Sequence, residues 1–158
     1  MPLLLGTAFI MCYFLFFGLF RTYHWLYPKY FVSGESMNPT YREQEVIQVK
    51  SHHQPQRFDV VVLHPPDDPE ELYLKRIVGL PGEQVDFKEG QLFVNEKPVA
   101  DEFADRTEDF NWKSLYKEPI PEGYYFVMGD NRTVSRDSRI FGVVSKKQIL
   151  GIIKEENN

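Results

Sequence analysis

The first twenty residues, MPLLLGTAFIMCYFLFFGLF, carry no charged side chain. As a helix rising about 1.5 Å per residue, this run covers about 30 Å, the hydrocarbon thickness of a bilayer. A cleavable signal peptide would show a basic start, a shorter apolar core and a cleavage site of small residues, and the run has none of these. We therefore expect residues 1–20 to form a transmembrane anchor.

The next segment, residues 21–31, has the sequence RTYHWLYPKYF. Its aromatic residues are typical of the belt that a membrane protein places at the headgroup level, so we expect an interfacial linker. The alternative is a buried aromatic helix of a soluble core, which the long uninterrupted apolar run before it disfavours. Arg21 and Lys29 follow the span and no basic side chain precedes it, but so small a bias does not set the orientation.

Residues 32–158 are predicted to form one mainly β domain, antiparallel and barrel-like, following the single transmembrane helix. From residue 44 onward the apolar residues alternate or form short runs, such as EVIQV, FDVVVLH, QLFV, YYFVMG and ILGII. We expect a hairpin turn at Glu89-Gly90, a second turn at Asn95-Glu96 and a short helix near Ser145–Ile149. The polar segment 101–122 is expected to be an exposed excursion.

Composition argues against two classes of function. Lys plus Arg is 18 and Asp plus Glu is 23, a net charge of −5, whereas a nucleic-acid partner needs a basic surface. Cys12 is the only cysteine, so the chain has neither an intrachain disulfide nor a cysteine zinc site. The four histidines lack metal-ligand spacing, and we therefore do not expect a metal mechanism.

The first chemically suggestive stretch is FVSGESMNPT, which places Ser36 between Gly34 and Pro39. A serine hydroxyl becomes a nucleophile only with a nearby base and with donors for the oxyanion, so it needs an exposed, tightly turned backbone. Taken alone, the stretch is better explained as an ordinary loop.

The second stretch is LYLKRIVGLPG, where Lys75 interrupts an apolar strand. Tyr73, Lys75 and Ile77 would face the same side of the strand, which desolvates the ammonium group and favours the neutral amine. To act as a base near pH 7 to 8, the lysine pKa must fall by roughly 3 units from about 10.4. The alternative is a strand-edge lysine that reaches water.

The third stretch is GDNRTVSRDSRIFG, residues 129–142, which follows the strand YYFVM. Its four charged residues Asp130, Arg132, Asp137 and Arg139 could form a charge-assisted network that fixes a loop beside a catalytic site. A solvated surface turn is the alternative.

Together the three stretches resemble one family, the type I signal peptidases, and in particular the small forms of Gram-positive bacteria. The match covers nearly the whole chain in the expected order, from the membrane span through SGESMNPT and YLKRIVGLPG to GDNRTVSRDSRIFG. The resemblance implies a membrane-bound serine endopeptidase that removes signal peptides from exported preproteins after small residues of the Ala-X-Ala type. Such a peptidase needs neither a metal nor an organic cofactor.

The resemblance also implies roles for individual residues. Ser36 matches the nucleophile and Lys75 its general base, while Ser135 would hydrogen-bond the lysine amine and Asp137 and Arg139 would support it. The positions matching the shallow substrate pockets are Val32, Met37, Tyr41, Tyr73 and Leu74. Some relatives have a serine as oxyanion donor where this chain has Gly34, so the backbone N–H of Ser36 is the safer donor.

The implied location is the cell membrane, single-pass, with the catalytic domain on the extracytoplasmic face. The implied partners are signal peptides, the lipid bilayer and, near the site of action, the secretion translocase. A non-catalytic accessory of surface-protein or pilus assembly is the alternative. Such an accessory would have lost the serine or the lysine, and both are present here.

Overall fold

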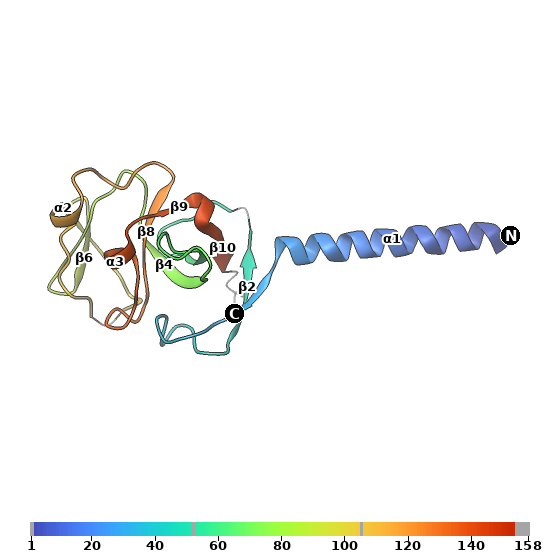
Figure 1. Ribbon diagram of the computed structural model, residues 1–158, viewed down its shortest axis with the longest axis horizontal. Coiled ribbons are helices and arrows are strands. Elements are labelled where there is room, and N and C mark those ends of the chain that lie inside the picture. The colour runs from blue at the N-terminus through green and yellow to red at the C-terminus, as the bar shows by residue number, and fades with distance from the viewer. Residues whose placement is uncertain (1, 52, 105, 154–158) are drawn as a thin grey trace.

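Helix α1 (Pro2–Leu26) projects from a β domain formed by the described residues that follow it (Figure 1). The computed structural model describes residues 2–51, 53–104 and 106–153. Within α1, the window Phe9–Leu26 has a mean hydropathy of 1.2 and is wholly unburied, so length and composition suit a membrane span. The helix runs six residues past the predicted end of the anchor, and the expected linker 21–31 therefore divides into helix, a short connection and strand β1 (Lys29–Phe31).

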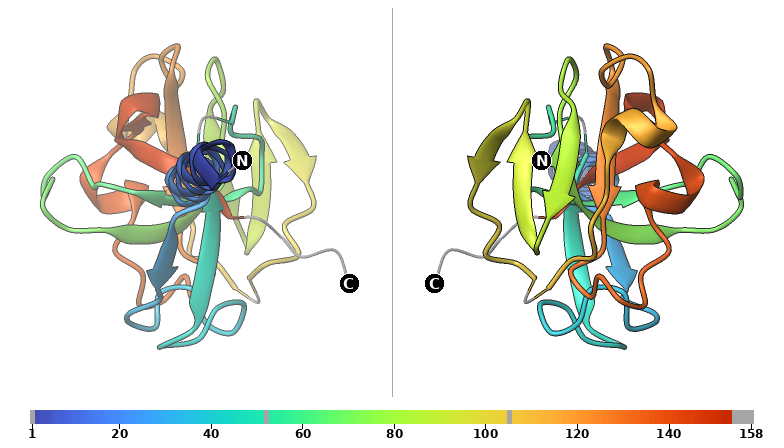
Figure 2. Two further views of the ribbon diagram at one scale, coloured as in Figure 1. Left: turned by 90° about the vertical axis from the view of Figure 1, so that its right-hand side faces the viewer. Right: turned by 90° about the vertical axis from the view of Figure 1, so that its left-hand side faces the viewer.

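The domain is built on one seven-stranded antiparallel sheet in the order β1-β2-β10-β3-β4-β8-β9. The strands that follow β1 are β2 (Val46–Lys50), β3 (Val60–Leu63), β4 (Tyr73–Gly79), β8 (Tyr124–Met128), β9 (Val144–Ser145) and β10 (Ile149–Ile153). The sheet curls into a half-barrel, seen along α1 in Figure 2. The prediction of a mainly β, barrel-like fold preceded by one apolar helix is confirmed.

A second, three-stranded antiparallel sheet contains β5 (Val85–Lys88), β6 (Gln91–Val94) and β7 (Lys97–Val99). Both of its turns have two consecutive residues with positive φ, 52° and 82° at Glu89 and Gly90 and 50° and 66° at Asn95 and Glu96. This is the backbone that tight two-residue hairpins require, so both predicted turns are confirmed. Figure 1 shows β6 at the end of the domain farthest from α1.

The short helices are α2 (Trp112–Leu115), α3 (Ser138–Phe141) and the 3-10 helix η1 (Lys146–Gln148), which lies where a short helix was predicted. The expectation that segment 101–122 is exposed is wrong for some of its side chains. Trp112 and Ile120 are each only 1% exposed. The Trp112 ring packs edge-on against Phe126, and its indole N–H donates to the Glu118 carbonyl at 3.0 Å, so the excursion folds back onto the core.

Strand β4 is buried on both faces. Its residues from Lys75 to Gly79 are all buried, so Ile77 and Val78 contribute to two different apolar clusters. A lysine and an arginine, Lys75 and Arg76, therefore enter the interior on opposite faces of the same strand. Each needs a partner, because an unpaired charge is costly to bury.

Candidate active site

The structure brings Ser36 and Lys75 into direct contact across 39 residues of sequence. Ser36 begins the turn 36–40 between β1 and β2, and Lys75 comes from β4. The Lys75 Nζ donates to the Ser36 Oγ at 2.8 Å and to the Leu74 carbonyl at 2.9 Å. A serine hydroxyl and an amine at this distance can exchange a proton.

The Lys75 amine lies in a desolvated environment, with only 3% of the residue exposed. Burial lowers the pKa of Lys75 to about 8, although the negative charges of Asp137 and Asp130 raise it. The amine also lies 5.0 Å from the centroid of the Tyr73 ring. A substantial fraction of the amine is therefore neutral and able to accept a proton near physiological pH.

The backbone around Ser36 is held in place from one side. The Asn131 N–H donates to the Ser36 carbonyl at 3.0 Å, and the Asn131 side-chain amide donates to the Glu35 carbonyl at 3.1 Å. Among the described residues, none accepts a hydrogen bond from the Ser36 N–H, which leaves this donor available. Gly34 has a φ of +82°, a conformation that a side chain at this position would strain.

Gly129 allows the loop 129–142 to approach the Ser36 backbone closely. A Cβ atom at this position would lie 2.3 Å from the Ser135 Oγ and 2.4 Å from the Ser36 carbonyl oxygen. Ser135 is 7% exposed, and its Oγ has no hydrogen-bond partner in the described part of the chain. The expected hydrogen bond between Ser135 and the Lys75 amine is therefore absent from this structure.

A buried ion pair joins three segments around the serine. The Arg76 guanidinium donates twice to the Asp130 carboxylate, at 2.8 and 2.6 Å, and once to the Phe58 carbonyl at 2.7 Å. The Thr40 hydroxyl, four residues after Ser36, donates to the same carboxylate at 2.6 Å. Sequence reasoning did not select Arg76. The available signal was an arginine in the middle of an apolar strand, which must find a partner if buried.

The other three charged residues of the predicted network form two further pairs. Arg139 donates to both carboxylate oxygens of Asp137, at 2.9 and 2.8 Å, and Asp137 also accepts from the Gly129 N–H at 3.2 Å. Arg132 donates to Asp101 at 2.7 Å and to the Thr107 hydroxyl at 2.6 Å. The predicted network thus consists of three pairs, two of which use partners outside the loop.

A hollow of about 420 Å³ opens beside the dyad. Its lining residues are Ser33, Gly34, Glu35, Ser36, Glu71, Leu72, Tyr73, Leu74, Lys75, Val134 and Arg136. Of the predicted pocket residues, Tyr73 and Leu74 therefore line the hollow. Val32, Met37 and Tyr41 are not among its lining residues. Val32 and Met37 are buried in an apolar cluster against which Tyr41 and Leu74 pack. Tyr73 packs with a different cluster, so the start of β4 contributes both of its faces to the site.

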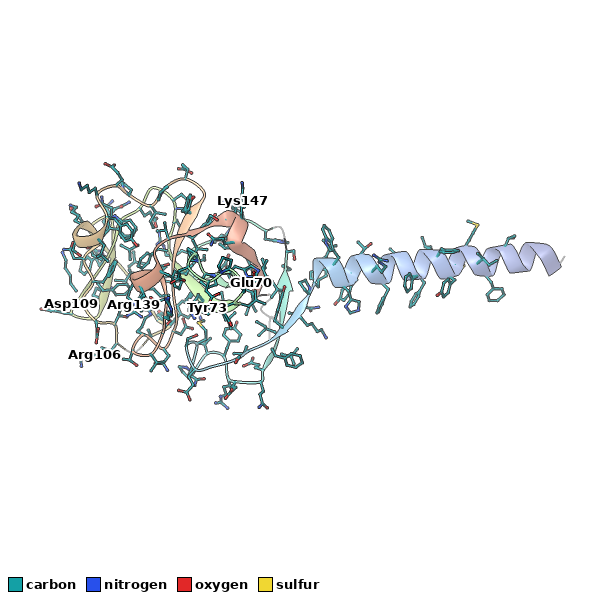
Figure 3. All side chains as sticks on the ribbon, viewed as in Figure 1. Glu70, Tyr73, Arg106, Asp109, Arg139 and Lys147 are labelled. Carbon is teal, nitrogen blue, oxygen red and sulfur yellow. The ribbon has the colours of Figure 1, made fainter. Side chains whose placement is uncertain are left out.

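A larger hollow of about 990 Å³ is lined by Glu89–Gln91, Arg106–Asp109 and Thr133 and contains neither Ser36 nor Lys75. Figure 3 shows Arg106 and Asp109 at the end of the domain away from α1, whereas Tyr73 lies near its middle. Within residues 2–51, 53–104 and 106–153, no group of three histidine, cysteine or acidic side chains could hold a metal ion. The smaller hollow is the candidate site, because it combines a nucleophile and a base.

The chain is similar to one known family over nearly its whole length. The family model described as signal peptidase, peptidase S26, matches residues 4–155. The chain belongs to this family. Its members are serine endopeptidases associated with membranes, so the resemblance inferred from the three motifs and the prediction of an enzyme are confirmed. Membership supports a role in the removal of signal peptides from preproteins.

Individual relatives show how far the similarity extends. Signal peptidase I V of Bacillus subtilis is 40% identical, and the match covers 82% of this chain and 85% of the relative. Signal peptidase IB of Staphylococcus aureus is 33% identical over 84% of this chain and 78% of the relative. The crystal structure of a signal peptidase I from Enterococcus faecalis superposes with a TM-score of 0.60 at 33% identity, covering 65% of this chain and 98% of that structure.

Proposed function

We propose that this protein is a membrane-anchored endopeptidase that cuts signal peptides from exported preproteins, with Ser36 as the nucleophile and Lys75 as the general base. One observation carries the proposal. The buried amine of Lys75, whose pKa is lowered to about 8, lies 2.8 Å from the Ser36 hydroxyl beside an open hollow. No observation favours the non-catalytic accessory.

The reaction begins when neutral Lys75 accepts the hydroxyl proton while the Ser36 Oγ bonds to the carbonyl carbon of the scissile peptide. The oxygen of the tetrahedral intermediate gains negative charge, and the Ser36 N–H, which donates to none of the described residues, can stabilise it. The C–N bond then breaks, and the departing amine takes the proton from Lys75. The signal peptide remains as an ester on Ser36 until water attacks it and Lys75 accepts the proton of that water. The ester C–O bond then breaks, and Lys75 returns the proton to the Ser36 Oγ.

Three residues of the loop 129–142 are proposed to position this dyad. The Asp137–Arg139 pair fixes the shape of the loop, since Asp137 also accepts from the Gly129 N–H and Arg139 also donates to the Arg132 carbonyl. The negative charge of Asp137 raises the pKa of Lys75 and limits the effect of burial. Ser135 has a buried hydroxyl without a hydrogen-bond partner in the part of the chain that the structure describes. It is available to accept a hydrogen bond from the ammonium group when proton transfer breaks the contact with Ser36.

The preference for small substrate residues follows from the shape proposed for bound substrate. An extended segment beside β4 would direct alternate side chains toward the protein, so two inward positions would be separated by one outward position. Leu74, which lines the hollow, packs against the cluster that contains Val32 and Met37, which are 6% and 1% exposed, so this side of the hollow is already occupied by protein. Little room remains for large inward side chains, which is why we propose cleavage after sequences of the Ala-X-Ala type.

We further propose that residues 1–20 anchor the chain, that residues 21–31 lie at the interface, and that residues 32–158 work on the extracytoplasmic face near the translocase. Supporting this placement, α1 ends at Leu26 and β1 begins at Lys29, so the β domain follows the apolar helix with only two residues between them. Protease digestion of intact vesicles tests the orientation. Degradation of the domain only from the cytoplasmic side would contradict it.

The catalytic assignment is tested with full-length Ser36→Ala and Lys75→Met in detergent micelles or vesicles, using a preprotein substrate. We expect each variant to lose about 1,000-fold or more of the cleavage rate, because neither half of the dyad works alone. Ser114→Ala and Lys97→Met, both at exposed positions away from the hollow, are the matched controls. Undiminished cleavage by either dyad variant would overturn the assignment, and failure of a serine-directed inhibitor to label Ser36 would favour the accessory.

A further inference from the structure

The connection between β3 and β4, residues 64–72 with the sequence HPPDDPEEL, forms one side of the proposed substrate hollow. Its base is closed by a hydrogen bond of 2.9 Å between the His64 ring Nδ1 and the Glu71 carbonyl. Beyond this base, Asp67 reaches across to Arg136, whose Nη2 donates to the Asp67 carboxylate. The two residues are 69 positions apart in sequence.

We propose that the Arg136–Asp67 ion pair is a clasp that holds the connection 64–72 in place. The clasp thereby fixes the side of the hollow that this connection forms. The inference rests on the proposed function, because it treats the hollow beside Ser36 as the place where substrate binds. Arg136 and Asp67 are positioning residues in this proposal. Neither is assigned a part in the proton transfer.

The contacts of the connection show why a clasp matters. Glu71 and Leu72, at its end, line the hollow, and Tyr73 and Lys75 of β4 follow directly. In the described part of the chain, the Arg136 contact is the single hydrogen bond that ties positions 65–70 to a segment outside residues 64–72. Without it, the tip of the connection is tethered only through its own base.

Arg136 is suited to act as the fixed side of the clasp. Its neighbours Ser135 and Asp137 are 7% and 0% exposed, so its backbone is set by buried residues. The connection 64–72, by contrast, carries four acidic residues within five positions, Asp67, Asp68, Glu70 and Glu71. Their mutual repulsion favours a spread of conformations, which one arginine restrains. If the connection is already ordered before substrate binds, less conformational entropy is lost on binding, and the affinity for substrate is higher.

Loss of the ion pair can be distinguished from loss of a side chain that touches substrate, because only one residue of the clasp lines the hollow. Arg136 lines the hollow and could touch substrate, whereas Asp67 does not line it. Asp67→Asn therefore breaks the ion pair without removing a lining side chain. With 47% and 40% of the two side chains exposed, the pair is an exposed one, and its loss is expected to raise KM about threefold to fivefold with kcat unchanged.

The experiment compares Asp67→Asn, Arg136→Gln, the double variant and Arg136→Lys in the full chain, with a preprotein substrate. We expect both single variants to raise KM, the double variant to do no more than one of them, and Arg136→Lys to restore most of the affinity. Added salt should raise KM for the native protein more than for Asp67→Asn. The matched control is Lys113→Gln, which breaks the exposed Lys113–Glu96 pair at 3.4 Å and should leave KM unchanged.

A second readout does not depend on catalysis. Amide hydrogen exchange within residues 66–71 of the substrate-free protein should be faster in Asp67→Asn than in the native chain. Unchanged KM and unchanged exchange would overturn the clasp, and so would a lower KM, which would mean that the pair obstructs substrate. A fall in kcat alone would also overturn it. Failure of the catalytic proposal is distinguishable, because it appears as cleavage that survives Ser36→Ala.

Discussion

Two regions of the β domain differ in the side chains that they bury. The apolar cluster at the three-stranded sheet buries Phe87, Leu92 and Trp112, each no more than 1% exposed. The region around the hollow contains apolar clusters too, but it also buries charged residues, including Lys75, Arg76 and Asp137, each no more than 3% exposed. The apolar region gains stability from burial, whereas the region of the hollow stays folded only while its buried charged groups keep their partners.

Burial has a different role in each region: it stabilises the fold at the three-stranded sheet, and near the hollow it also changes a pKa. At the remote sheet, the removal of side chains from water contributes stability. At the site, the same removal lowers the pKa of Lys75, because the neutral amine is easier to bury than the ammonium ion. Substitutions at the three-stranded sheet should therefore act mainly on stability. Substitutions near the hollow should act on stability and on the chemistry together.

The largest effect on stability is expected for Arg76→Met. The substitution leaves the Asp130 carboxylate, whose side chain is 0% exposed, without its guanidinium partner. We expect the free energy of unfolding to fall by about 3 to 5 kcal/mol, measured by urea unfolding of the full chain in detergent. The double variant Arg76→Met with Asp130→Asn should recover part of this loss. Equal stability of the single and double variants would show that the unpaired charge is not the cause.

Leu92→Ala tests how much the apolar cluster at the three-stranded sheet contributes to stability. Leu92 is 0% exposed within the cluster that also contains Phe87 and Trp112, so truncation leaves a cavity. The expected loss is about 2 to 5 kcal/mol of unfolding free energy, with the cleavage rate of the folded fraction unchanged. The rate is measured below the unfolding transition. A large fall in that rate would contradict the proposal that the three-stranded sheet contributes to stability and not to the chemistry.

Gly129→Ala should affect both stability and chemistry. The added Cβ would meet the Ser135 hydroxyl and the Ser36 carbonyl at less than 2.5 Å, so one of them must move. Overpacking of this kind costs about 1 to 3 kcal/mol, and a shift of about 1 Å in a nucleophile can cost on the order of 100-fold in rate. Gly18→Ala, where nothing lies within 4 Å of the added atom, is the control. Native activity in Gly129→Ala would contradict the tight packing.

Asp137→Asn should change the pH dependence, the smallest of these effects. The negative charge of Asp137 raises the pKa of Lys75, so its removal should lower that pKa. More of the amine is then neutral at a given pH, and the acidic limb of the kcat/KM profile should move to lower pH. Asp109→Asn, on the larger and remote hollow, is the control and should leave the limb in place. A shift to higher pH would contradict the assigned electrostatics.

Much of the fold could be predicted from local patterns. Period-two runs gave the strands, and the pairs Glu89-Gly90 and Asn95-Glu96 marked turns that need positive φ. Strand β1 was missed because Lys29–Phe31 is short and its aromatic composition also suits an interface. The burial of Trp112 and Ile120 was missed because the polar residues around them are typical of a surface segment.

The contacts within the site could be predicted from local sequence patterns only in part. Ser36 and Lys75 were selected from motifs that match a family, and their contact depends on a turn and a strand 39 residues apart. The pairing of Arg76 with Asp130 joins residues 54 positions apart, and alternation along β4 gives no hint of the partner. Charged residues in a motif can be recognised from sequence, but the choice of partner depends on the tertiary fold.

The most direct test of the central claim is the pH dependence of acylation at Ser36, measured with a serine-directed acylating inhibitor on the full-length chain. The rate should rise with pH around a midpoint near the lowered pKa of Lys75, about 8, and Lys75→Met should abolish the rise. A midpoint near the ordinary lysine pKa of about 10.4 would contradict the account, because the amine would then be charged where the reaction needs it neutral. A rise that survives Lys75→Met would contradict it as well.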